Sequence, residues 1–329
     1  MKRFKDILCI LLPDVGGDAA LERAVVLANN NQAYLTVVEI VDEIPPNTKL
    51  LDRVLSPYDL QAKMVEEHRQ RLEELVTPWR DNVEIQINVL SGIPFIEIIK
   101  EVLRNDRDLV IKTAESGGLL DRVFGSNDMH LLRKCPCPVW LVKPKSPDTY
   151  KQILAAVDVD DNYPSEELNT RHLLNHKILE MACSLALSES GKLHIVHAWD
   201  AIGEGVMRSG FFHTPEDKIN AYVEEVRQHQ NHNLNVLMSE ITNKLGRDAL
   251  EYIKPQMHLL RGMPRKIVPD FAVKIKAELV VMGTVARTGL PGFFMGNTAE
   301  SILSQLDCSV LAVKPPGFET PVTLGAKKS

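Results

Sequence analysis

Several features that define specialised protein classes are scarce in this sequence of 329 residues. Aromatic residues make up only 5% of the chain. No apolar run reaches the roughly 18 residues that a membrane span needs. The formal net charge is −6, so the basic excess typical of nucleic-acid-binding proteins is absent. We therefore expect neither a nucleic-acid partner nor a membrane span.

Cysteine is also scarce, and the five cysteines form no C-x-x-C pair. Disulfide-rich secreted domains and zinc sites need paired spacings, so we expect reduced thiols in a cytoplasmic protein. Cys135-Pro-Cys137 could form a metal or redox pair, but two small residues entering a buried strand are the favoured interpretation. Residues 1–13 resemble a short secretory signal. Residues 150–157 have the same sequence pattern in mid-chain, where a secretory signal cannot lie, so both segments are interpreted as buried strands.

What the chain does contain is a globular composition, with 44% hydrophobic and 25% charged residues. At roughly 150 residues per domain, the length suggests two domains. Internal similarity supports this division, because residues 91–94 (SGIP) and 108–111 (DLVI) recur at 261–264 (RGMP) and 278–281 (ELVV). We predict that the same fold occurs twice in tandem, in domains spanning 1–146 and 147–329.

Each half alternates apolar strand patterns with helical patterns, which predicts an α/β fold with a parallel sheet and helices on both faces. We expect two tandem Rossmann-like domains, each with a five-stranded parallel sheet, packed as an internal pseudo-dimer. The last strands, 139–142 and 310–313, are expected to meet across the domain boundary and cover an open sheet edge. The expected helices cover 19–30, 58–80, 96–103, 177–190, 215–245 and 265–276.

A glycine-rich loop follows the apolar strand at 278–282. It runs from Gly283 to Gly296 and is followed by Asn297-Thr298-Ala299-Glu300, a pattern typical of a helix start that Asn297 could cap. Glycine backbone and a helix N-terminus suit a phosphate group, and ligands of parallel sheets bind beyond the strand carboxyl ends. The alternative is an ordinary surface loop.

These residues resemble the nucleotide-binding motif of the universal stress protein family, G-x-x-G-x(9)-G-S/T. The spacing from Gly283 to Gly296 matches in full, while Ala286 replaces the second glycine and Asn297 replaces Ser/Thr. The chain most closely resembles the tandem, E-type members of Gram-negative bacteria, and the resemblance covers both halves.

The resemblance implies an adenine nucleotide such as ATP in the second half. Asp158 would face the sugar or a Mg²⁺ bridging to the phosphates, Ala156 and Ala198 would line the adenine slot, and Met282 would lie near the ribose. Arg287 could neutralise phosphate charge, with a solvated surface cation as the alternative. The implied nucleotide-binding residues are Ala156, Asp158, Ala198, Met282, Gly283, Val285, Ala286, Arg287, Gly296, Asn297 and Thr298.

The first half departs from this motif. Leu12 stands where the second half has Asp158, Thr113 replaces the first glycine, and Glu115 adds a negative charge. We expect no nucleotide there through this motif, although Gly125-Ser126 could still begin a helix that accepts an anion.

Other groups of residues give weaker signals of function. His229-x-x-His232 could be a zinc pair, but a solvated polar helix face is favoured. His194 and His197 should point to opposite faces of one strand, with His197 a packed or hydrogen-bonded core residue. Residues 201–214 could form a lid over the nucleotide or an inter-domain contact.

The functional prediction is a nucleotide-binding stress-response protein in which binding, rather than turnover, alters contacts with protein partners. No catalytic triad, paired carboxylates or P-loop signature is present, so no catalytic residue is assigned. The alternatives are a slow ATPase and a nucleotide-free scaffold that binds another small ligand in the first half. Further homodimerisation of the tandem chain stays open.

Overall fold

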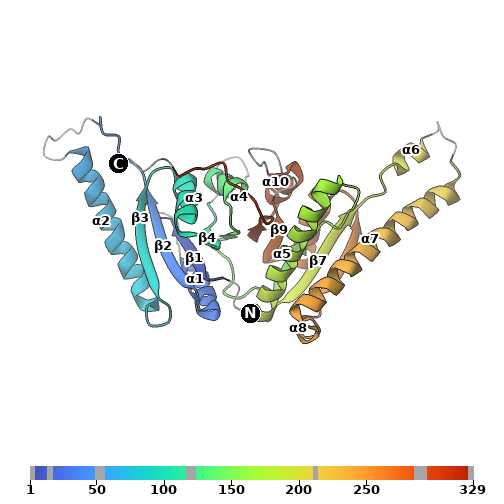
Figure 1. Ribbon diagram of the computed structural model, residues 1–329, viewed down its shortest axis with the longest axis horizontal. Coiled ribbons are helices and arrows are strands. Elements are labelled where there is room, and N and C mark those ends of the chain that lie inside the picture. Colours follow the sequence, from blue (N-terminus) through green and yellow to red (C-terminus); the bar gives the residue numbers. More distant parts are fainter. Residues whose placement is uncertain are drawn as a thin grey trace.

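The structure is a computed structural model that describes residues 4–12, 18–48, 56–115, 124–209, 214–284 and 295–324. Two similar halves lie side by side, the first drawn from blue to green and the second from green to red (Figure 1). Each half alternates strands and helices in the predicted order.

The first half contributes the elements β1 to β5 and α1 to α4. Their bounds are β1 Asp6–Leu11, α1 Asp18–Asn31, β2 Tyr34–Val41, α2 Pro57–Val76, a 3₁₀ turn Thr77–Trp79, β3 Ile85–Ser91, α3 Pro94–Asn105, β4 Leu109–Thr113, α4 Ser126–Lys134 and β5 Val139–Val142. The second half contributes β6 Gln152–Ala156, α5 Ser165–Glu189, β7 Lys192–Trp199, α6 Glu204–Arg208, α7 Glu216–Leu245, α8 Arg247–Ile253, β8 Gln256–Arg261, α9 Pro264–Ile275, β9 Leu279–Gly283, α10 Asn297–Leu303 and β10 Ser309–Val313.

The ten strands of the described residues form one sheet in the order β3-β2-β1-β4-β5-β10-β9-β6-β7-β8. Strand pairing is parallel within each half. It is antiparallel only where the halves join, at β5 and β10, with Leu311 opposite Trp140. The prediction of two Rossmann-like domains is confirmed, and so is the meeting of their last strands.

The inner strands are mostly apolar and buried because helices cover both faces of the sheet, whereas the edge strands β3 and β8 also contain polar and exposed residues. One core layer lies under α1, α2, α5, α7 and α8, and the other lies under α3, α4, α9 and α10. Each layer contains residues of both halves, so the hydrophobic core continues across the domain boundary. Among the described residues, no helix combines the length and the apolar character required to cross a bilayer.

Two helices differ from the sequence prediction in ways that affect the site. Helix α5 begins at Ser165, a full three turns before the predicted start at residue 177. Helix α10 begins at Asn297 as predicted, but Gly296 is the N-cap residue, and among the described residues no side chain caps the helix. The expectation that Asn297 caps α10 is therefore wrong, because extended Gly296 already makes Asn297 the first helical residue.

Candidate functional site

The candidate site lies at the carboxyl edge of the second half's sheet. Strands β6 and β9 are neighbours there, while β7 and β10 extend the sheet in opposite directions. This reversal of strand order is where open parallel sheets bind their ligands. Asp158 follows the end of β6, and Gly283 ends β9.

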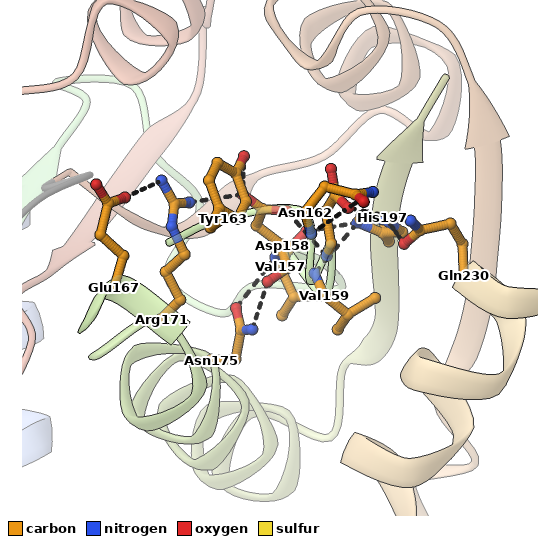
Figure 2. Close-up of polar contacts among 11 residues, drawn as sticks. Val157, Asp158, Val159, Asn162, Tyr163, Glu167, Arg171, Asn175, His197 and Gln230 are labelled. Carbon is orange, nitrogen blue, oxygen red and sulfur yellow. Dashed lines mark hydrogen bonds and ion pairs between the residues drawn. The ribbon is translucent and has the colours of Figure 1, made fainter. Parts of the chain in front are cut away.

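The carboxylate of Asp158 is held by two side chains that follow it in the sequence (Figure 2). Its Oδ2 accepts hydrogen bonds from the Tyr163 hydroxyl at 3.0 Å and from Arg171 at 2.8 Å. Burial and the nearby Asp158 charge raise the pKa of Tyr163 to about 12, so its hydroxyl stays a donor. The other oxygen, Oδ1, accepts the backbone N–H of Asp160 at 3.3 Å.

Arg171 is fixed from three sides. Its guanidinium lies 3.4 Å from the ring centroid of Tyr163, and it contacts Glu167 one turn earlier in α5 at 3.3 Å. Together with Asp158, two carboxylates face this one cation. The Arg171 charge is therefore already balanced within the protein.

Asn175, buried in α5, fixes the backbone of Asp158. Its side-chain oxygen accepts the Asp158 N–H at 3.0 Å, and its side-chain nitrogen donates to the Asp158 carbonyl at 2.6 Å. A short chain of contacts then runs from His197 through Gln230 to Asp160. His197 also contacts the Val157 carbonyl oxygen at 3.3 Å, which confirms it as a hydrogen-bonded core histidine (Figure 2).

The other predicted site residues lie around this edge with different exposure. Ala156 and Ala198 are half-buried at the ends of β6 and β7, whereas Met282 is 3% exposed and packs in the core. Gly296 is half-buried, and the first two residues of α10, Asn297 and Thr298, are exposed. The remaining predicted residues, Val285, Ala286 and Arg287, lie outside the described residues.

Gly283 has a structural role that the sequence did not suggest. A Cβ atom built on it would lie 2.6 Å from Cδ2 of Leu174 in α5. The absence of a side chain therefore lets α5 pack closely on the end of β9.

A groove of about 510 Å³ opens beside Asp158, between α5 and α7. Its lining includes four carboxylates, those of Asp158, Asp160, Asp161 and Glu240, and one guanidinium, that of Arg171. Asp161 pairs with His229 at 2.8 Å. Burial by itself would raise the pKa of Asp161, but the contact with His229 lowers this pKa below its usual value.

In the first half, the corresponding position is filled by the protein's own charges. Lys112, at the position of Met282, bonds Asp128 at 2.6 Å, and both side chains are buried. Glu115 contacts Lys112 at 3.2 Å, and its carboxylate lies 2.3 Å from where a Cβ on Gly125 would be. The Glu115 carboxylate therefore lies beside Gly125, the N-cap residue of α4 and the counterpart of Gly296.

Two histidine predictions and the cysteine prediction can be assessed directly. His194 faces away from His197 and contacts His258 on the α9 side, as a regular strand requires. Cys135 and Cys137 are buried free thiols, which agrees with small residues entering a strand. His229 contacts Asp161 and Asn233 rather than a second histidine. Of the segment 201–214, residues 210–213 lie outside the described residues, so both alternatives for it, a lid and an inter-domain contact, stay predictions.

Sequence reasoning missed the residues that hold Asp158 in place: Tyr163, Arg171 and Asn175. It also missed a second group, since His172 and His176 of α5 lie beside Glu240 of α7. One sequence signal pointed to this group, because two histidines four residues apart share a helix face.

The comparisons with known proteins extend over nearly the whole chain. The model of the universal stress protein family matches residues 3–143 and again residues 149–314. Universal stress protein E of Escherichia coli strain K12 is 31% identical over 343 aligned positions, which cover 98% of each chain. The universal stress protein E homologue of Haemophilus influenzae is 30% identical, covering 95% of this chain and 98% of its own.

Solved structures show the same architecture. A functionally unknown protein from Pseudomonas aeruginosa PAO1 superposes with a TM-score of 0.66 at 25% identity, covering 95% of this chain and 94% of its own. A universal stress protein from Archaeoglobus fulgidus DSM 4304 gives a TM-score of 0.60 at 19% identity, covering 93% and 98%, which shows a shared fold.

Proposed function

The chain belongs to the universal stress protein family, and from this premise we propose that its second half binds ATP or a related adenine nucleotide during the stress response. Binding, rather than turnover, is the proposed output, and the bound state would alter contacts with protein partners. A cytoplasmic location is part of the proposal, and the free thiols support it.

The observation that supports this function best is the position of Asp158. Its side chain is 42% exposed at the point where the strand order reverses, and Asn175 fixes its backbone. A ribose hydroxyl could donate to this carboxylate.

A Mg²⁺ ion fits the site only in part. Tyr163 and Arg171 already occupy Oδ2 of Asp158, which leaves Oδ1 as one carboxylate ligand. Mg²⁺ commonly takes one or two carboxylates together with phosphate oxygens and water, so a single oxygen is sufficient. When bound, the ion would neutralise phosphate charge beside Asp158.

In the first half, the buried Lys112–Asp128 pair supports the view that no nucleotide binds through the corresponding motif. We therefore expect one nucleotide per chain. Denaturing the purified protein and identifying the released small molecules by mass spectrometry tests this, with adenine nucleotide as the expected product.

Calorimetric titration of the nucleotide-free chain with Mg-ATP gives the second test. Asp158→Asn should weaken binding about tenfold or more, which corresponds to about 1.4 kcal/mol. Asp161→Asn is the matched control, because this carboxylate lies three residues away but pairs with His229. An unchanged dissociation constant for Asp158→Asn, or no binding by the wild type, would refute the proposal.

A further inference from the structure

A second polar cluster lies between α5 and α7, outside the carboxyl-edge residues proposed for the nucleotide. It consists of His172 and His176 of α5 and Glu240 of α7. The two histidines are four residues apart and therefore lie on the same face of their helix. Glu240 faces them from the neighbouring helix, so the cluster links two elements far apart in the sequence.

The three side chains converge on one point. Nε2 of His176 lies 2.8 Å from Oε2 of Glu240, and Nε2 of His172 lies 3.4 Å from the same oxygen. All three ligand atoms lie within 4.8 Å of one another. Ligands about 2.0–2.1 Å from a tetrahedral zinc ion are about 3.3 Å apart, so small side-chain rotations place all three around one ion.

The arrangement differs from an ordinary surface ion pair. Asp161, which lines the same groove, forms a one-to-one pair with His229, in which a single imidazole meets a single carboxylate. At Glu240, two imidazoles compete for one carboxylate oxygen, and their ring centroids are 4.6 Å apart. A dication placed between the three groups binds both nitrogens and the oxygen at once.

Charge and access also favour a cation. Besides Glu240 itself, the groove that contains His172 is lined by three carboxylates, those of Asp158, Asp160 and Asp161, and by one guanidinium. Two lysines lie on the other side of the cluster, and each contacts a group outside it. Lys244 pairs with Glu180, and Lys177 donates to the Lys314 carbonyl. The exposed fractions of the three side chains, 49% for His172, 16% for His176 and 39% for Glu240, leave a path for an ion from solvent.

We propose that His172, His176 and Glu240 bind Zn²⁺ and thereby link α5 to α7. Two imidazoles and one carboxylate suit zinc better than Mg²⁺ or Ca²⁺, which prefer oxygen ligands. A water molecule from the groove supplies the fourth ligand. The site does not depend on nucleotide binding, so it can be tested in the absence of nucleotide.

The experiment titrates the full chain with Zn²⁺ after treatment with EDTA, in competition with a chromophoric chelator at neutral pH. The wild type should bind one equivalent of Zn²⁺ tightly, and Co²⁺ should give the visible absorption of a four-coordinate ion. His176→Ala and Glu240→Ala should each weaken this site at least about tenfold. Zn²⁺ should also raise the melting temperature of the wild type more than that of either variant.

His229→Ala is the matched control, because it removes a histidine that pairs with Asp161, a carboxylate of the same groove, and should bind Zn²⁺ like the wild type. Circular dichroism checks that each variant folds. If His176→Ala does not fold, the more exposed His172→Ala decides. The proposal is overturned if the folded ligand variants keep the wild-type affinity, or if the wild type has no tight site.

Discussion

At the scale of single residues, the two halves fill the same buried positions differently, with an ion pair in the first half and with apolar side chains in the second. The buried pair Lys112 and Asp128 of the first half corresponds to Met282 and Ala299 of the second, which are buried and apolar. Burial raises the pKa of Asp128 even though Lys112 lies 2.6 Å away and opposes the shift. The ion pair therefore compensates a desolvation cost rather than adding large stability.

This gives a prediction about stability. Asp128→Ala removes the shortest contact of the buried Lys112 and leaves it the longer one to Glu115 at 3.2 Å, so the free energy of unfolding should fall by up to about 3 kcal/mol. The double variant Lys112→Met/Asp128→Ala copies the second half and should be more stable than Asp128→Ala alone. Urea denaturation of the wild type, both single variants and the double variant measures the coupling. Additive losses would contradict this account.

At the scale of elements, the close approach of α5 to β9 depends on Gly283. The Leu174 side chain occupies the space that a Cβ on Gly283 would need. Because β9 and α5 both border the candidate site, this contact also sets the distance between Asn175, which fixes Asp158, and the end of β9.

Gly283→Ala should therefore destabilise the protein by about 1–3 kcal/mol through overpacking. Adding Leu174→Val should recover part of this loss, because the shorter side chain leaves room for the new methyl group. Thermal unfolding of the two single variants and the double variant checks both statements. A Gly283→Ala protein as stable as the wild type would show that α5 moves freely.

The start of α5 explains how far the sequence could predict the site. The alternation of strands and helices along each half, the carboxyl-edge position of Asp158 and the helix start after Gly296 could be predicted from apolar runs, glycines and the family motif. The first three turns of α5 could not, because residues 165–176 are mostly polar and lack a continuous apolar stripe. Arg171, Asn175 and the two histidines lie in those turns, so the partners of Asp158 and the zinc cluster were missed together.

At the scale of the whole molecule, Lys314 joins the two halves. It follows β10, is 1% exposed, and donates to the Leu132 carbonyl at the end of α4 and to the Thr284 hydroxyl. Burial lowers the pKa of Lys314 from 10.5 to about 7, while the buried thiols Cys135 and Cys137 act in the opposite direction.

This shift predicts a pH dependence. The unfolded chain keeps the Lys314 proton up to pH 10.5, whereas the folded chain releases it near pH 7. Between these values the unfolded state binds more protons, so stability should rise with pH, by at most about 1.4 kcal/mol per unit.

Lys314→Met should remove this rise, and Lys143→Met, at the corresponding position of the first half, should keep it. Urea midpoints measured from neutral to alkaline pH provide the comparison. A wild type and a Lys314→Met variant with the same pH profile would contradict the prediction.

The antiparallel join of β5 and β10 has one more consequence. It turns the strand directions of the halves against each other, so their carboxyl edges lie at opposite rims of the shared sheet. In a pair of identical subunits, every substitution is copied at both rims. In a single chain that contains both halves, each rim can change independently. One rim can carry an internal ion pair while the other keeps its carboxylate, and the contact between β5 and β10 stays the same.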